Sequence, residues 1–239
     1  MPRMMASVLV GTAALAVAHA EVYMKEKFTS DTLDGWEQSF WKGETCSDDW
    51  QTSGRKSCMG KWEVTSGSWA VDTDEQKGLR TTENMAFHAI SKKFDKPFSN
   101  RNKDLVVQFS VKHESYTYGH CAGGYLKLLP TAGEPKEFGG DTKYNIMFGP
   151  DLCSYDVSKI HLIFNKGSDN LQKKDEIKLD YDEKNEFTHL YTLHLKPDNS
   201  AEVFFDQKSK WAGKLEDGWC VSHQGLTCDA WLTLFLCTN

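Results

Sequence analysis

The sequence predicts an all-β protein, a β-sandwich or a jelly roll, and three observations favour this class. Short runs rich in Val, Ile, Phe and Tyr recur along the chain, and Gly, Asn, Asp or Pro separate them. Almost no segment shows the sustained helical period of about 3.6 residues. Because only layered sheets bury so many half-apolar strands, we expect one large β domain.

The expected strands follow one another along most of the chain. The stretch WEVTSGSWAV (62–71) reads as a hairpin whose Ser-Gly turn joins two alternating strands. Further strands are expected at residues 105–113, 125–129, 144–148, 159–165, 189–195 and 201–205. The segment KPDNS predicts a turn, because Pro197 fixes φ and Asn199 tolerates the left-handed region. We expect the charged stretch 172–186 to be a solvated hairpin or loop.

The N-terminus predicts a secretory signal peptide over residues 1–20. A short basic start precedes an almost wholly apolar run to Val17, and Ala-His-Ala then has the small-x-small form of a cleavage site. The run is too short to span a bilayer as a permanent helix. We therefore expect Glu21 to begin the mature chain and residues 21–219 to form the globular domain.

Charge and cysteine content exclude several classes of partner. The net charge is −6 with a pI near 5.8 and no basic block, so nucleic acid is not an expected partner. No stretch after the N-terminal run approaches the roughly 18 apolar residues of a membrane span, so no membrane insertion is expected. The seven cysteines form no CxxC pair, which favours disulfides over zinc, and their odd number leaves at least one unpaired or shared between chains.

Two neighbouring stretches share a layout of glycine, aromatic residues and one cysteine each. In HCAGGYLKLL (120–129), Tyr125 and Lys127 are two residues apart and so point to one face of a strand. In YNIMFGPDLC (144–153), an apolar strand is followed by Gly149-Pro150, which we expect to turn the chain and project the next acid. A bridge between the two cysteines would close a loop of about 33 residues and hold both stretches together.

The side chains so gathered suit a sugar. The carboxylate of Asp151 can accept hydrogen bonds from two adjacent hydroxyls, and Lys127 can donate to sugar oxygens. Tyr125 and Tyr144 each offer a hydroxyl and an apolar ring face, while Gly123 and its neighbour would let a ligand approach the backbone. The alternative is that both tyrosines are ordinary half-buried strand residues.

Several longer motifs resemble the calreticulin/calnexin family. They are VYMKEKF, KGL, KPFSN, LVVQFSVKHE, CxGGYLKL, YNIMFGPDLC, HLIFN, EFTHLYTLHLKPDN and LEDGW, which occur in order between residues 22 and 219. YNIMFGPD and EFTHLYTL are the most specific of them, and the soluble branch of the family fits better than the membrane-bound one. The resemblance implies the N-terminal globular lectin domain of a chaperone, with a concanavalin-like jelly-roll fold.

The resemblance also implies a function and a place in the cell. Members of this family bind monoglucosylated N-glycans on unfolded glycoproteins in the lumen of the endoplasmic reticulum and thereby assist protein folding and quality control. They carry Ca²⁺. We accordingly expect unfolded, monoglucosylated glycoproteins as partners of a protein that is itself a monomer. No retrieval signal ends this chain, so secretion is the alternative location.

The family motifs assign roles to individual residues. The carbohydrate-binding residues implied by the resemblance are Tyr125, Lys127, Tyr144, Met147 and Asp151. The cysteines that flank the two motifs, Cys121 and Cys153, correspond to the family disulfide.

A calcium site is implied as well, built largely from backbone oxygens. Lys27, Glu75 and Lys77 occupy the matching positions. Main-chain oxygens suit Ca²⁺, a hard cation, and the side chains at these three positions would otherwise be read as ordinary surface charge.

This chain departs from the family pattern at Ala122, in a slightly longer segment between Lys112 and Cys121, and at two larger places. Cys46 and Cys58 lie in a stretch that looks inserted, and we predict a second disulfide there, with buried free thiols as the alternative. Beyond LEDGW, residues 220–239 lack the proline-rich arm, the returning strands and the acidic tail of the family. We expect this tail to be a truncated or out-of-frame end. The alternative is a native ending in which a strand WLTLFL fills the gap.

Two other classes of function compete with the lectin. A jelly roll can host a glycosidase, which needs two carboxylates at a fixed separation. The only dense acidic cluster is Asp180, Asp182 and Glu186, whose spacing lacks strand alternation, so we do not expect an enzyme. The second alternative is a secreted or truncated interaction protein with weakened sugar binding.

Overall fold

The protein folds as a sandwich of two β-sheets in the computed structural model. It describes residues 20–43, 45–46, 58–84, 86–114, 121–130, 133–153, 157–166, 169–173, 175–215, 227–228 and 231–238, with backbone alone for 121–122, 166, 169, 227–228 and 231–238. The expected signal peptide, residues 1–20, lies outside this description except for Ala20. No helix among the described residues is long and apolar enough to cross a membrane.

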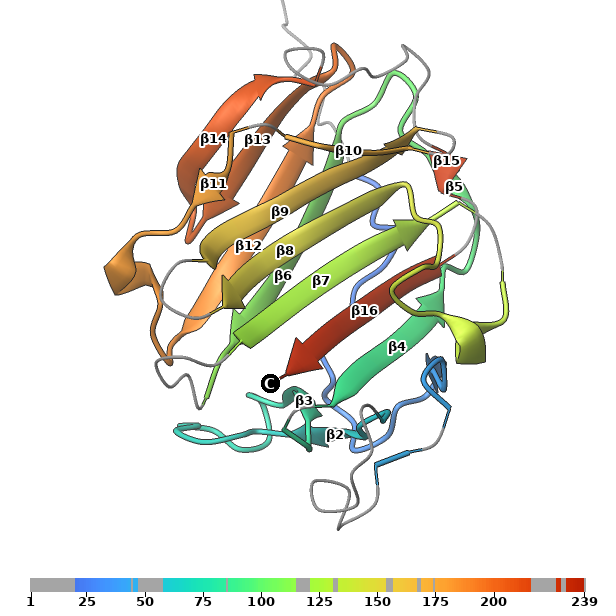
Figure 1. The fold of residues 1–239 in the computed structure, drawn as a ribbon, viewed down its shortest axis with the longest axis vertical. Coiled ribbons are helices and arrows are strands. Elements are labelled where there is room, and N and C mark those ends of the chain that lie inside the picture. The colour runs from blue at the N-terminus through green and yellow to red at the C-terminus, as the bar shows by residue number, and fades with distance from the viewer. Residues whose placement is uncertain are drawn as a thin grey trace, which may run out of the picture.

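The larger sheet forms one layer, and Figure 1 shows its central strands side by side in front. In the described residues it has eight strands in the order β1-β4-β16-β7-β8-β9-β10, with β11 paired to β9. These are β1 (Trp36–Gln38), β4 (Phe87–Lys93), β16 (Trp231–Thr238), β7 (Cys121–Leu129), β8 (Ile146–Cys153), β9 (Val157–Lys166), β10 (Asp169–Gln172) and β11 (Ile177–Lys178).

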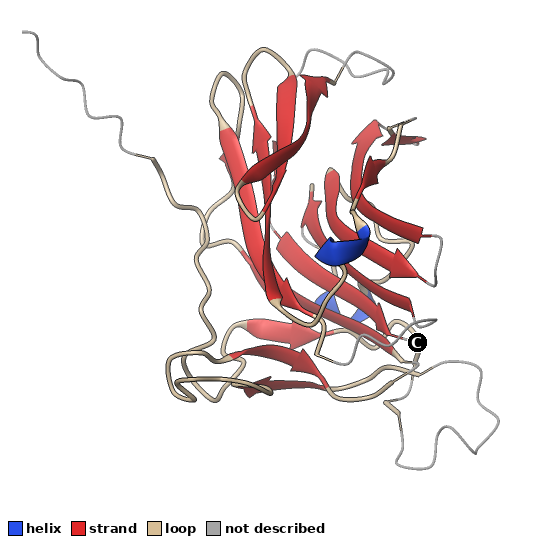
Figure 2. Ribbon diagram, turned by 90° about the vertical axis from the view of Figure 1, so that its left-hand side faces the viewer, coloured by secondary structure: helices blue, strands red, loops and turns tan. Residues whose placement is uncertain are grey.

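The smaller sheet forms the second layer, and Figure 2 shows the two layers facing each other. It has four strands in the order β14-β13-β12-β6, namely β14 (Lys208–Lys214), β13 (Ser200–Phe205), β12 (Thr188–Leu195) and β6 (Leu105–Lys112). Two short ladders complete the fold: β2 (Trp62–Thr65) with β3 (Gly78–Thr81), and β5 (Phe98–Ser99) with β15 (Thr227–Cys228). The 3-10 turns are η1 (Pro135–Glu137) and η2 (Tyr181–Glu183).

The main core lies between the two sheets. Alternate residues of the central strands, such as Leu126, Phe148 and Leu162, pack against Leu193 and Val203 of the smaller sheet, and all five are at most 5 % exposed. This alternation is the period-two pattern from which the strands were predicted. The expected all-β jelly-roll sandwich is therefore confirmed.

The chain end occupies the middle of the larger sheet. Strand β16 is antiparallel to both neighbours: Phe235 lies opposite Ala89 of β4 and opposite Tyr125 of β7. The structure thus has the tail strand WLTLFL that was expected only as the alternative to a truncated end, and this strand fills the gap between β4 and β7. Cys220 and the rest of the 216–226 segment lie outside the described residues.

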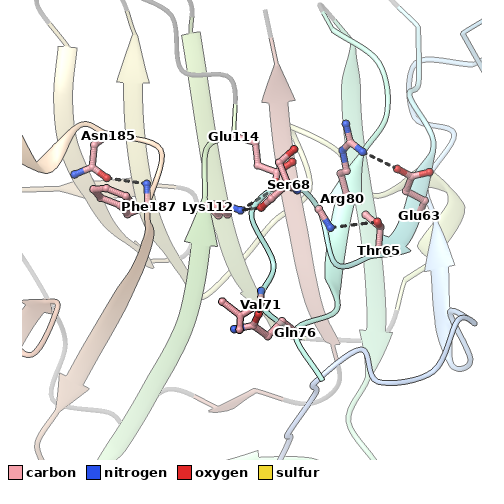
Figure 3. A network of polar contacts seen from close by, with 11 residues as sticks. Glu63, Thr65, Ser68, Val71, Gln76, Arg80, Lys112, Glu114, Asn185 and Phe187 are labelled. Carbon is pink, nitrogen blue, oxygen red and sulfur yellow. Dashed lines mark hydrogen bonds and ion pairs between the residues drawn. The ribbon is translucent and has the colours of Figure 1, made fainter. Parts of the chain in front are cut away.

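The hairpin expected at residues 62–71 is wrong, because β2 pairs instead with β3. Side chains hold the intervening segment: Glu114 Oε1 accepts a 2.6 Å hydrogen bond from Ser68 N, and Gln76 Oε1 accepts one of 2.7 Å from Val71 N (Figure 3). Val71 is 96 % exposed. Trp69 is likewise 85 % exposed, so the apolar residues of the expected second strand pack against no core, and alternation alone misled.

The turn expected at Gly149-Pro150 is also wrong, since β8 runs straight through it to Cys153. Gly149 has φ of +151°, and a Cβ atom there would overlap the carbonyl oxygen of Gly124 on β7. Glycine therefore permits a close approach of two strands rather than a reversal of the chain. By contrast, the turn between β12 and β13 has the predicted chemistry, with Asn199 at φ of +61°.

Candidate functional site

The residues predicted to bind sugar lie on β7, on β8 or just before β8, and the two strands are antiparallel neighbours. Gly123 lies opposite Asp151, and Lys127 lies opposite Met147. Because side chains alternate along a strand, these residues and Tyr125 share the face that points away from the main core. The register alone therefore gathers four of the five predicted residues, Tyr125, Lys127, Met147 and Asp151, on one outer face of the larger sheet.

Tyr125 and Asp151 contact each other directly. The Tyr125 hydroxyl donates a hydrogen bond to the Asp151 carboxylate, and the ring reaches back over Gly123, where a Cβ atom would lie 2.8 Å from that hydroxyl. Glycine at this position thus leaves the room that Tyr125 needs. The pair joins a phenol to an acid that is 22 % exposed, and so still open to a ligand.

His161 of β9 completes this cluster, although the sequence did not single it out. Its Nε2 lies 2.8 Å from Asp151 Oδ2, and its ring meets that of Tyr125 edge-on with centroids 5.4 Å apart. A carboxylate can only accept, so Nε2 carries the proton. The available signal was strand parity: His161 lies opposite Gly149 once β9 is placed beside β8.

The cluster keeps Asp151 ionised. The hydrogen bond from His161 is the main cause of a pKa of Asp151 below its usual value, and burial opposes it. The Tyr125 hydroxyl and the nearby Lys159 charge lower the pKa further. A partly buried carboxylate held in this state is a strong acceptor for sugar hydroxyls.

Lys127 is buried, only 3 % exposed, beneath the loop that follows η1. Its Nζ donates to the carbonyl oxygens of Gly139 at 3.1 Å and Gly140 at 3.3 Å. Burial lowers the pKa of Lys127 to about 8, and the neighbouring Asp141 carboxylate opposes this shift. The amine predicted to contact sugar thus fastens a loop in this structure.

Tyr144 and Met147 lie beside Lys127. The Tyr144 ring centroid is 5.1 Å from Lys127 Nζ, and burial raises the pKa of this tyrosine, which is 6 % exposed. Met147 is half-buried between Lys127 and Ile163 in the register. The structure therefore brings the five predicted residues into two adjoining groups, one around Asp151 and one around Lys127.

The cysteines predicted to pair occupy suitable places. The Cys46–Cys58 disulfide is formed. Cys153 is disulfide-bonded, and the residue opposite it in the register is Cys121, whose side chain lies outside the described part of the chain. The pairing of these last two stays a prediction.

The residues implied for calcium lie in two segments joined by an ion pair. Lys77 Nζ is 2.7 Å from Asp31 Oδ1, which ties the segment after Lys27 to the loop that contains Glu75. Among the described residues, no group of three or more His, Cys, Asp or Glu side chains is arranged to hold a metal ion. Any cation here would therefore depend largely on main-chain oxygens, which Ca²⁺ accepts.

One of the acids considered for catalysis, Asp180, has a structural role. Asp180 Oδ2 and Glu183 Oε1 lie 3.0 and 2.6 Å from Lys210 Nζ, so both carboxylates fasten η2 to β14. Asp151, on the sheet face, has a tyrosine and a histidine as hydrogen-bond partners rather than a second acid.

Comparison with known proteins shows the family of this chain. The family model described as "Calreticulin family" matches residues 24–221. The chain belongs to the calreticulin family. It is 42 % identical over 211 residues to calreticulins from Mus musculus and Homo sapiens, covering 88 % of this chain and 46 % of each relative.

Solved structures give the same answer for the fold. The T. cruzi calreticulin globular domain is 33 % identical with a TM-score of 0.74, covering 91 % of this chain and 83 % of that one. A glycoside hydrolase family 16 endo-glucanase from Bacteroides ovatus, 11 % identical with a TM-score of 0.53, covers 91 % and 87 % and shares the fold alone. The chain spans about half the length of the curated calreticulins that it matches.

Proposed function

We propose that this chain is a calcium-dependent lectin chaperone of the endoplasmic reticulum, which binds monoglucosylated N-glycans on unfolded glycoproteins. Membership of the calreticulin family supports a lectin chaperone in general. The observation that carries the finer proposal is the hydrogen-bonded cluster of Tyr125, Asp151 and His161 on the outer face of the larger sheet.

The cluster has the chemistry to recognise a terminal glucose. The Asp151 carboxylate accepts from two neighbouring sugar hydroxyls, because His161 and Tyr125 already hold it ionised and oriented. The half-buried Tyr125 ring offers an edge and a face to the apolar side of the sugar. Met147 adds an apolar contact next to it.

Calorimetry with a glucose-terminated high-mannose glycan tests this proposal. Asp151→Asn removes the charge, and Tyr125→Phe removes one hydroxyl. Each variant is expected to bind at least roughly tenfold more weakly, as for a lost hydrogen bond to a charged group.

Two controls accompany that measurement. The same glycan without its terminal glucose should give no heat, and circular dichroism should show both variants folded. Equal affinity of wild type and Asp151→Asn for the glucosylated glycan would refute the proposal. Release of reducing sugar from the glycan would replace the lectin with a hydrolase.

We further propose that Ca²⁺ binds through the main-chain oxygens of Lys27, Glu75 and Lys77. The Asp31–Lys77 ion pair supports this, since it aligns the two segments that would supply those oxygens. Adding Ca²⁺ to chelator-treated protein should raise the melting temperature, because the folded state alone binds the ion. Mg²⁺ at equal concentration is the control, and no shift with millimolar Ca²⁺ would rule the site out.

A further inference from the structure

The segment after β1 packs against the loop that holds Lys127. A Cβ atom at Gly139 would overlap the indole of Trp41, and one at Gly140 would lie 3.1 Å from it, so the ring lies directly on this glycine pair. The same two residues accept the hydrogen bonds of Lys127 through their carbonyl oxygens. Trp41 and Lys127 thus contact the same two residues of one loop.

Backbone contacts fix this segment in place. The Lys136 carbonyl oxygen in η1 accepts hydrogen bonds from Phe40 N at 2.6 Å and Ser39 Oγ at 3.2 Å. Ser39 N in turn donates to Ala89 O of β4 at 2.9 Å. The segment is therefore a brace between the larger sheet and the loop from Lys136 to Gly140.

The Cys46–Cys58 disulfide closes the loop that follows this segment. Cys46 N donates to Met59 O at 2.8 Å, and Met59 is fully buried, with Trp41, Phe87 and Tyr125 packed around it and Ala89. Met59 belongs to the stretch that the sequence marked as inserted, whereas Trp41 lies just before that stretch, and the two side chains pack together. Met59 adjoins Tyr125, and Trp41 adjoins the loop over Lys127.

The Trp41 ring is arranged to support the loop rather than to stack on a sugar. One neighbour is the Gly139-Gly140 backbone, and the Lys42 ammonium lies 3.8 Å from the ring centroid. Phe87 meets the ring edge-on at 5.7 Å. Because these protein groups surround the ring, it would influence sugar binding by holding the loop and not by touching the sugar.

We propose that Trp41 is a positioning residue of the glycan site, which holds the Gly139-Gly140 loop in place and through it the amine of Lys127. The hydrogen bonds of Ser39 and Phe40 to the Lys136 carbonyl oxygen keep Trp41 there, and Met59, next to the disulfide, packs against it. This inference rests on the sugar site proposed above and adds to it a residue outside the family's sugar motifs.

Trp41→Ala is the direct test, with two readouts. The loop loses its support, so the affinity for the glucose-terminated glycan should fall about tenfold, as when a charged hydrogen bond is misplaced. Lys127 becomes hydrated, so its pKa, followed by NMR of its side chain in the unliganded protein, should rise from about 8 toward 10.5.

Matched variants separate positioning from a loss of folding. Trp41→Phe keeps a ring on Gly139 and should restore most of the affinity and the low pKa. Trp69→Ala removes a tryptophan that is 85 % exposed and should change neither quantity. Cys46→Ser with Cys58→Ser loosens the segment and should move both in the direction of Trp41→Ala, with a smaller effect.

The outcomes distinguish this inference from the proposed function. If wild type binds the glycan, and Trp41→Ala binds it within twofold or keeps the pKa of Lys127 near 8, the positioning role is refuted and the lectin stands. If wild type ignores the glycan, the lectin fails, while a raised pKa in Trp41→Ala would still show that Trp41 holds Lys127.

Discussion

The two faces of strands β7, β8 and β9 differ in what they bury. The inner face carries Leu126, Phe148 and Leu162, which pack against the smaller sheet in one apolar core. The outer face of the same strands carries Lys127 and Asp151, whose polar atoms are held by hydrogen bonds to a loop and to His161. One face of these strands therefore builds the core, and the other carries the residues of the proposed glycan site.

Strand alternation is the physical reason that the two faces differ so sharply. Met147 and Phe148 are neighbours in the chain, yet one lies between Lys127 and Ile163 on the outer face and the other is completely buried in the core. Neighbouring substitutions should therefore have different consequences. Single substitutions on each face test this comparison.

Phe148→Ala should have the largest effect and should act on stability. Removal of a fully buried ring from the core is expected to lower the free energy of unfolding by about 3–5 kcal/mol. The matched variant Met147→Ala should stay within about 1 kcal/mol of wild type. It should instead weaken glycan binding roughly fivefold, as for a lost apolar contact. Denaturant unfolding and calorimetry measure the two quantities.

The contrast would disappear if both variants lost the same stability. It would be reversed if Phe148→Ala, kept folded at low temperature, bound glycan more weakly than Met147→Ala. Either result would show that the faces are coupled through the strands.

Glu26→Gln should lower the free energy of unfolding by less than Phe148→Ala does. It tests the inner face of the larger sheet at β4, outside the main core. There the N-terminal segment covers β4: Glu26 accepts from Lys92 Nζ at 2.8 Å and Trp36 Nε1 at 3.1 Å. Burial opposes these hydrogen bonds, yet with two backbone N–H groups they lower the pKa of Glu26 to about 2. Because Glu26 is 27 % exposed, we expect a loss of about 2 kcal/mol at pH 7.

The stability that Glu26 contributes should depend on pH in a definite direction. A lowered folded pKa adds stability above the unfolded value near 4.5, and that stability is lost as the pH falls through about 2. The difference between wild type and Glu26→Gln should therefore shrink as the pH falls through this range. Glu63→Gln, which breaks an ion pair about half exposed on both sides, should cost under about 0.5 kcal/mol. A pH-independent difference would contradict the role of Glu26.

The sequence predicted the strands and the residues of the outer face because side chains alternate between the two faces with a period of two residues. Tyr125 and Lys127 share a face by spacing alone, and pairing with β8 adds Asp151. His161 was missed because its place depends on which strand lies next to β8. Trp41 was missed because its contact with Gly139 joins segments about a hundred residues apart.

Local signals failed where a neighbouring strand or side chain outweighed them. Gly149-Pro150 reads as a turn, but pairing with β7 and β9 keeps it in a strand. The Ser-Gly pair before Trp69 reads as a hairpin, but Glu114 and Lys112 hold this segment from β6 and the residues just beyond it.

The sequence by itself determined that this chain is an all-β sandwich, that it has calreticulin motifs, and which side chains of β7 and β8 could meet a sugar. Only the tertiary structure decided that Lys127 lies under a loop, that His161 and Trp41 adjoin the site, and that residues 231–238 lie between β4 and β7. The reason is range. Alternation and motif spacing act within one strand, whereas sheet order and loop packing depend on which distant segments bury one another's surface.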